Sequence, residues 1–202
     1  MAAVTIRFCD EFDGGFGWIV ENEFTKRCSH ALVAGGRVWL VDPVDGAGVD
    51  ERLRGAGEPA AVIQLLDRHN RDARAFAQRL GVPHHEVPVD AIGHAPFEFV
   101  VVRSRRWWKE VALWWPARRV LVCADVLGTV GYFVAPGERI GVHPLLRPFP
   151  PRRLGRVQPA IVLCGHGEGV LADAEEPFHD ALSTARRRLP AALANALRAR
   201  RR

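Results

Sequence analysis

The 202-residue sequence is poor in lysine, and this scarcity limits what its positive charge can mean. Only Lys26 and Lys109 are lysine, so nearly all of the 28 basic residues are arginine. With abundant alanine and glycine, this bias is typical of a bacterial-type, GC-rich coding composition, and it weakens any inference from arginine to nucleic-acid binding. Much of the formal net charge of +5 lies in two arginine runs near the C-terminus. They indicate a basic helix or tail at about 186–202 rather than a basic binding face.

Cysteine and long apolar runs are also scarce. The four cysteines form no Cys-x-x-Cys pair, which argues against a disulfide scaffold and against a zinc ribbon. No apolar run reaches the roughly 18 residues that span a bilayer, and no charged segment followed by an apolar one opens the chain. We therefore expect a cytoplasmic protein with neither a membrane nor a nucleic acid as its partner.

Familiar catalytic motifs are missing as well. The sequence has no Gly-x-Ser-x-Gly elbow, no Walker loop and no dinucleotide-binding glycine fingerprint. The length fits a single domain over residues 1–202.

Apolar, strand-like runs alternate with glycine- and proline-rich turns along the chain. Two such runs flank Gly35-Gly36 and predict a hairpin. Continuous apolar runs predict buried strands, and helical spacing predicts two helices. The predicted strands are 60–66, 97–103, 110–115, 120–125 and 160–164; the predicted helices are 73–80 and 174–189; a long insertion covers 127–154.

Polar side chains follow three of the predicted buried strands. Asp67, His69 and Asp72 follow the first, Asp125 ends the second, and His166 follows the third. Carboxylates and imidazoles at the ends of buried strands are costly unless they meet a partner. They are also the ligand types that suit zinc, iron or manganese. The glycines on either side of His166 allow a tight turn that brings the ring inward.

This order of strands and polar ends resembles the metallo-β-lactamase superfamily over about residues 30–170. The resemblance implies an α/β fold, an αββα sandwich of two mixed sheets flanked by helices, with a metal site at the sheet edges. The strand Val38–Pro43 is similar to the family's early strand that ends in aspartate. Asp125 matches the family's bridging aspartate, and His166, in Gly-His-Gly, matches its last histidine.

The family's His-x-His-x-Asp-His loop falls on residues 67–72, where only His69 keeps the ligand type. Asp67 takes the first histidine position, Arg71 the aspartate position and Asp72 the last histidine position. The family's lone histidine falls near Arg106. The resemblance therefore implies a rewritten, degenerate metal site, and a guanidinium in the loop argues against a second metal ion.

Two alternatives follow from this departure. In the first, one zinc, iron or manganese ion binds between Asp67, His69, Asp125 and His166, and the protein hydrolyses an ester, thioester or phosphoester. Asp72 or Asp125 would then act as the base.

In the second alternative no metal binds, and the chain is a non-catalytic relative. Arg71, with Arg68 or Arg106, would pair with Asp67, Asp72 and Asp125, and the cleft would be structural or would bind an anionic ligand through arginine forks.

The long insertion supplies two more candidates. His143 and Arg147 would line the pocket and contact a small-molecule substrate, or they would pack within the loop beside Pro144 and Pro148.

Overall fold

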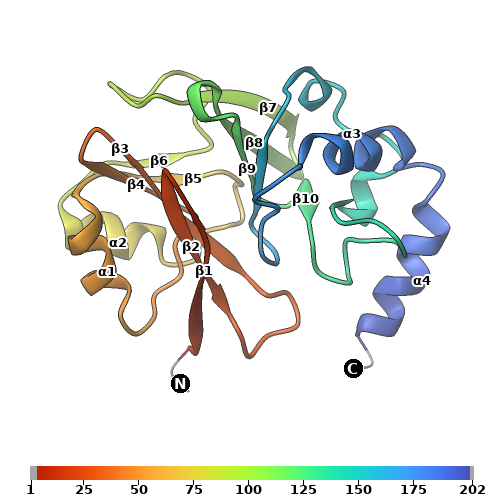
Figure 1. The fold of residues 1–202 in the computed structure, drawn as a ribbon, viewed down its shortest axis with the longest axis horizontal. Helices are drawn as coiled ribbons and strands as arrows, with labels where there is room; N and C mark the ends of the chain where they lie inside the picture. The colour runs from red at the N-terminus through yellow and green to blue at the C-terminus, as the bar shows by residue number, and fades with distance from the viewer. Residues whose placement is uncertain (1–3, 201–202) are drawn as a thin grey trace.

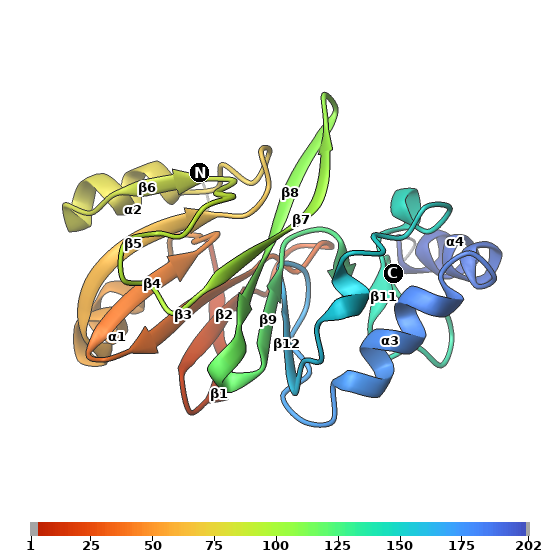
Figure 2. The same ribbon diagram turned by 90° about the horizontal axis from the view of Figure 1, so that it is seen from above.

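Two β-sheets pack face to face, and helices cover the outer face of each (Figures 1 and 2). The computed structural model describes residues 4–200. The first sheet has the strand order β1-β2-β3-β4-β5-β6, and the second has the order β12-β9-β8-β7. Both sheets mix parallel and antiparallel pairs, so the expected αββα layering is confirmed.

The first sheet comes from the N-terminal part of the chain. Its first four strands pair antiparallel, and β5 and β6 are added in parallel. The predicted hairpin is confirmed as β3–β4, with Gly35 and Gly36 at positive φ in its turn. The strands are β1 (Ile6–Phe12), β2 (Gly15–Val20), β3 (Cys28–Ala34), β4 (Arg37–Val41), β5 (Glu58–Gln64) and β6 (His84–Glu86).

The second sheet comes from the middle and the C-terminal part of the chain. Its strands are β7 (Glu98–Arg105), β8 (Trp108–Trp115), β9 (Val120–Cys123) and β12 (Ile161–Cys164). Because β9 and β12 run parallel, both end at the same edge of the sheet. The insertion carries β10 (Leu127–Gly128), β11 (Gly141–Val142) and the short helical turns η2 (Pro144–Leu146) and η3 (Leu154–Arg156); η1 (Pro116–Arg118) joins β8 to β9.

Side-chain alternation along β4 divides the interior into two layers. Val38 and Leu40 pack with the helices of the first sheet, whereas Trp39 and Val41 pack between the two sheets. The helices on the first sheet are α1 (Val49–Ala56) and α2 (Ala73–Leu80). The second coincides with the helix predicted over 73–80.

The helix expected over 174–189 is present but ends early, and a second helix begins at Leu189. They are α3 (Glu175–Thr184) and α4 (Leu189–Ala199). Pro190 lies in the first turn of α4, where its missing N–H costs nothing, whereas inside a continuous helix it would remove a hydrogen bond. Phe178 of α3 is buried in the core of the second sheet, and Asn195 of α4 donates to backbone carbonyls of the insertion. Among residues 4–200, no helix has the length and apolar character needed to cross a bilayer.

Candidate metal centre

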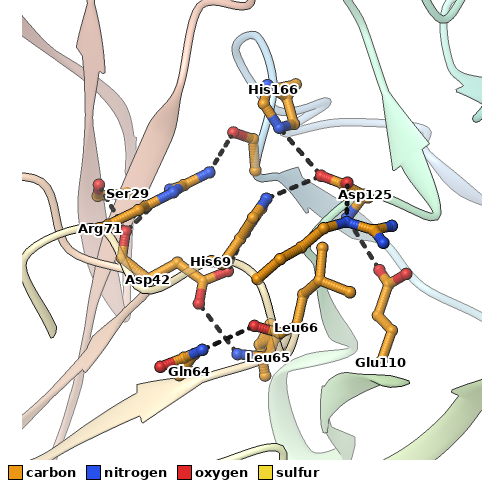
Figure 3. A network of polar contacts seen from close by, with 12 residues as sticks. Ser29, Asp42, Gln64, Leu65, Leu66, His69, Arg71, Glu110, Asp125 and His166 are labelled. Atoms are coloured by element: carbon orange, nitrogen blue, oxygen red, sulfur yellow. Dashed lines mark hydrogen bonds and ion pairs between the residues drawn. The ribbon is translucent and has the colours of Figure 1, made fainter. Parts of the chain in front are cut away.

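Three side chains from distant parts of the sequence meet at the edge between the two sheets. His69 lies on the loop between β5 and α2, Asp125 follows β9, and His166 follows β12 (Figure 3). One ligand atom of each lies within 4.8 Å of the others. The convergence of these three residues, on which both functional alternatives depend, is therefore present.

The contacts within this cluster are short. Nε2 of His69 lies 2.8 Å from Oδ1 of Asp125, and Nε2 of His166 lies 3.0 Å from the same oxygen. The other ring nitrogens have partners of their own. Nδ1 of His69 donates to Oδ2 of Asp42 at 2.9 Å, and Nδ1 of His166 donates to the carbonyl of Thr25 at 2.8 Å. A carbonyl only accepts, so Nδ1 of His166 carries the proton.

These partners determine what the cluster can bind. In a neutral imidazole with its proton on Nδ1, the Nε2 atom presents a lone pair. Oδ1 of Asp125 is buried and, within the described residues, receives no hydrogen bond of acceptable geometry. Three electron-pair donors thus face one point. Metal-bound histidines in proteins usually donate their other N–H to a carboxylate or a carbonyl, as both rings do here. The donor set therefore fits a divalent metal ion.

Asp42 holds His69 in position and was not among the residues that the sequence singled out for the site. It follows β4 with a positive φ of 45°, and its Oδ1 accepts a hydrogen bond from the amide of Leu65. Burial and the charge of Arg71 oppose protonation of His69, but Asp42 and Asp125 outweigh them and raise its pKa. The sequence signal for Asp42 was its place at the end of a family-like strand.

The charge of Asp125 is stabilised from two directions. Burial alone would raise its pKa, but His166 and His69 hold the pKa of this carboxyl well below its usual range. Behind it, Oε1 of the buried Glu110 accepts the amides of Asp125 and Val126 at 2.9 and 2.8 Å. These bonds fix the backbone at the end of β9. Burial, followed by the charge of Asp125, raises the pKa of Glu110 to about 8.

Two glycines make the turn of His166 possible. A Cβ on Gly165 would lie 2.7 Å from the carbonyl oxygen of Ala124, and one on Gly167 would lie 2.2 Å from Oγ1 of Thr129. Gly167 also has a φ of +88°, which side chains other than glycine rarely adopt. The Gly-His-Gly pattern is thus required by close packing on both sides of the ring.

Arg71 does not replace the metal by pairing with carboxylates. Its guanidinium donates to the backbone carbonyls of Cys28, Asp42 and Gly165 at 2.6, 2.8 and 2.9 Å. Burial lowers its pKa from the usual value, while the charges of Asp42 and Asp125 oppose that shift. The residue ties β3, the end of β4 and the end of β12 together, so its role in this structure is to join three segments.

The cation that approaches Asp125 is Arg68. Its Nε lies 3.7 Å from Oδ2 of Asp125, and its guanidinium stacks over the ring of Trp108 at 4.0 Å. Nη1 of Arg68 also donates to the carbonyl of Trp107. A positive charge therefore lies beside the cluster without entering it.

Four residues expected at the site lie elsewhere. Asp67 lines a separate cavity beside β7 and β8, because its amide donates to Lys109 and turns the chain toward that hairpin. Asp72 begins α2, and its Oδ2 accepts the amide of Asp45. Arg106 is exposed in the turn between β7 and β8.

Arg147 is the fourth, and it is fully buried inside the insertion. Its guanidinium pairs with Glu138 at 2.5 Å and donates to the carbonyls of Phe133 and Val142. Because its guanidinium binds several parts of the insertion, Arg147 stabilises the insertion and does not line the cavity beside the cluster.

A cavity of about 240 Å³ opens beside Asp125 and His166. Phe133 forms one wall and stacks on the His166 ring with 5.5 Å between centroids. His143 lines this cavity, as one of the two interpretations of the insertion predicts. The remaining lining residues are Phe24, Thr25, Val130, Tyr132 and Arg200. The pocket is therefore small, largely aromatic and apolar, with one arginine at its wall.

His143 should make the protein less stable in mild acid. Burial lowers the pKa of His143 to about 4, below its usual value near 6.5, and its Nδ1 accepts the amide of Leu145. The neutral ring stabilises the fold above about pH 6.5, and that contribution is lost as the pH falls toward 4. Between pH 7 and pH 4.5 we expect this residue to cost about 2–3 kcal/mol of unfolding free energy.

Urea denaturation at these two pH values measures the effect. The matched variant His143→Asn keeps an acceptor for the Leu145 amide but does not titrate, so it should lose about 2–3 kcal/mol less than the wild type. Equal losses in the two proteins would contradict the prediction.

Comparisons with known proteins show the fold but no close relative. No family model and no curated protein matches the sequence. Among solved structures, the DIM-1 metallo-β-lactamase exposed to ceftazidime matches with a TM-score of 0.57 at 13% identity, covering 90% of this chain and 99% of that chain. A fragment of diflavin flavoprotein A 5 from Nostoc sp. PCC 7120 matches with a TM-score of 0.61 at 12% identity, covering 96% and 99%. The B3 metallo-β-lactamase BLEG-1 matches with a TM-score of 0.53 at 16% identity, covering 81% and 97%.

Proposed function

We propose that this chain, which has the metallo-β-lactamase fold, is a hydrolase that uses a single divalent metal ion to cleave a small ester, thioester or phosphoester. The observation that carries the proposal is the convergence of His69, Asp125 and His166 with three lone pairs facing one point. Two imidazoles and one carboxylate are a ligand set found in catalytic zinc sites and in non-haem iron sites. Zinc, iron and manganese are therefore the candidate ions.

Each residue has a separate task in this proposal. His69, Asp125 and His166 would hold the ion, which when bound would polarise the substrate and activate water. Asp42 fixes the tautomer and the orientation of His69. Arg68 keeps a positive charge near Asp125 and favours an anionic or polarised substrate group. The loop position at which the family places a second set of ligands holds the partly buried Arg71, which supports a site for one ion.

The cavity suggests the size of the substrate. Its aromatic and apolar walls suit a small acyl or aryl group, and Arg200 at the wall suits a carboxylate or a phosphate on that group. His143 lies within the cavity as a neutral ring near neutral pH; because its Nδ1 accepts the amide of Leu145, its Nε2 carries the proton and can donate one hydrogen bond to the substrate.

A second candidate function follows from the raised pKa of His69. Without a metal, the protonated imidazole of His69 would pair with Asp125, and Arg68 and Arg200 would add positive charge beside it. Such a chain would bind a small anion without hydrolysing it.

Hydrolysis assays on metal-reconstituted protein test the proposal. The protein is stripped with a chelator, and zinc, manganese or iron(II) is returned one at a time. A nitrophenyl acyl ester, a thioester and a phosphate mono- and diester then serve as probes. We expect turnover of at least one probe class, abolished by chelation and restored by metal. His166→Ala should lower kcat/KM by at least about 100-fold, since it removes a ligand rather than a supporting group.

The matched control is Glu168→Gln, which alters an exposed carboxylate two residues from His166 that pairs with Arg7. It should keep the activity of the wild type, because an exposed ion pair contributes little. Absence of hydrolysis with every ion, together with phosphate-dependent thermal stabilisation of the metal-free protein, would favour the anion-binding alternative.

A further inference from the structure

A second group of metal-ligating side chains lies inside the first sheet. Cys9 and Asp10 come from β1, and Cys28 and His30 come from β3. All four are buried, with exposed fractions of 6%, 5%, 0% and 1%. Two thiols, a carboxylate and an imidazole shielded from water in one place are an unusual set for a core, because the polar members are costly to bury without a partner.

The backbone brings the four side chains together across β2. Cys9 pairs with Gly17 of β2, and Gly17 pairs with His30 of β3. A Cβ on Gly17 would lie 3.0 Å from Cδ2 of His30 and 3.2 Å from Cβ of Asp10, so a side chain there would fill the space in which they meet. The pairing of β1 with β2 shifts register after Cys9, and Asp10 has a positive φ of 52°. This bulge allows two consecutive residues to reach the same cluster.

The distances among three of these side chains suit a zinc ion, because the ligand atoms of Cys9, Asp10 and Cys28 all lie within 4.8 Å of one another. Two sulfurs bound at about 2.3 Å lie about 3.8 Å apart in a tetrahedron, and a sulfur and a nitrogen lie about 3.6 Å apart. The two Sγ atoms of Cys9 and Cys28 are 3.7 Å apart, and Sγ of Cys28 is 3.6 Å from Nε2 of His30. Oδ2 of Asp10 lies 3.7 Å from Sγ of Cys28 and 3.1 Å from Nε2 of His30.

The charges around the cluster also suit a divalent ion. Two thiolates and one carboxylate carry three negative charges, and zinc would neutralise two of them. The guanidinium of Arg71 donates to the carbonyl of Cys28 and supplies a further positive charge nearby.

We propose that Cys9, Asp10 and Cys28 bind one structural zinc ion, separate from the proposed hydrolase centre, with His30 beside them and in contact with Asp10 and Cys28. Binding converts two thiols and one zinc ion into a zinc dithiolate and two released protons, with no change in oxidation state. The ion would connect β1 and β3 to the loop of His166, because Oδ1 of Asp10 accepts the amide of Gly169 and the amide of Cys28 donates to Gly165. This proposal is independent of the proposed hydrolase function.

Cobalt substitution of the reduced, metal-stripped full chain tests the site. Tetrahedral cobalt bound to thiolate gives a sulfur-to-metal charge-transfer band, which the cluster of His69, Asp125 and His166 cannot produce because it has no thiol. We expect the band to saturate at one equivalent per chain and to persist in His166→Ala. It should be lost in Cys9→Ala and kept in Cys164→Ala, the matched replacement of a buried cysteine outside the cluster.

Zinc titration of the wild type gives a second measurement that does not depend on a variant that folds. In weak buffer, one equivalent of zinc at this site should release two protons and protect two of the four thiols from a thiol reagent. A folded, reduced chain that shows no thiolate band would overturn the proposal. So would a band that survives in Cys9→Ala, or a Cys9–Cys28 disulfide with no cobalt uptake after reduction.

Discussion

Replacing Asp125 with asparagine is expected to abolish metal binding and at the same time to stabilise the metal-free protein. An amide oxygen is a weak ligand for a divalent ion, so metal affinity should fall by more than the roughly 10–100-fold that loss of a supporting partner costs. In the metal-free protein, by contrast, the new amide N–H groups can donate to the Nε2 lone pairs of His69 and His166, which now face the carboxylate. The substitution also removes a negative charge close to the buried Glu110.

The stabilisation should be about 1–2 kcal/mol in the metal-free protein at alkaline pH. Urea denaturation after chelation measures it, and elemental analysis of protein incubated with one metal at a time measures the loss of binding. Glu168→Gln again serves as the control, since its carboxylate is exposed and pairs with Arg7.

A loss of stability on Asp125→Asn in the metal-free protein would support the anion-binding alternative. If the centre is a metal-free ion-pair network, His69 is protonated when folded and its raised pKa stabilises the fold at low pH. That contribution is complete below about pH 6.5, the usual value, and is lost as the pH rises through the folded pKa. Asp125→Asn would then destabilise the chain, most strongly in mild acid. A Tm of the metal-free protein that falls after this substitution would therefore contradict the metal centre.

Much of the fold could be predicted, and the sequence also singled out the three residues that meet at the centre, His69, Asp125 and His166, largely because they depend on local patterns. Apolar runs that end in a polar residue give both the strand and the place of its ligand, and parallel strands bring such ends to one edge. Asp125 and His166 follow directly from this rule. The glycines beside His166 add a close-packing requirement that is visible in the sequence.

Side-chain direction within the 67–72 loop could not be predicted in the same way. Asp67 and His69 are two residues apart, yet one faces the β7–β8 hairpin and the other faces Asp125. The difference comes from a β-bridge between Leu66 and Glu110, a contact between distant segments. The same holds for the cluster of Cys9 and Cys28, which are 19 residues apart and meet because both strands flank Gly17.

Arg71 also depends on contacts between distant segments, and its replacement with methionine should strongly lower the free energy of unfolding. The residue has a positive φ of 38°, which directs its side chain into the interior. There its guanidinium donates to one carbonyl on β3, one after β4 and one after β12. These three segments are far apart in the sequence. Methionine fills similar space but removes the guanidinium donor from all three carbonyls, although the carbonyl of Asp42 still accepts from Oγ of Ser29 and that of Gly165 from the amide of Cys28. We expect a loss of about 3–5 kcal/mol of unfolding free energy.

Urea denaturation of Arg71→Met beside Arg68→Met checks this expectation. Arg68 belongs to the same loop, but its side chain is 43% exposed and stacks on Trp108, so its loss should cost about 1 kcal/mol or less. Arg71→Lys separates charge from geometry, because an ammonium keeps the charge but cannot span the three carbonyls that the guanidinium reaches. This variant should retain less than half of the unfolding free energy that Arg71→Met loses. If Arg71→Asp instead folded normally and gained a metal ion, the arginine would be a replacement for that ion, and the interpretation of Arg71 as a link between three segments would be wrong.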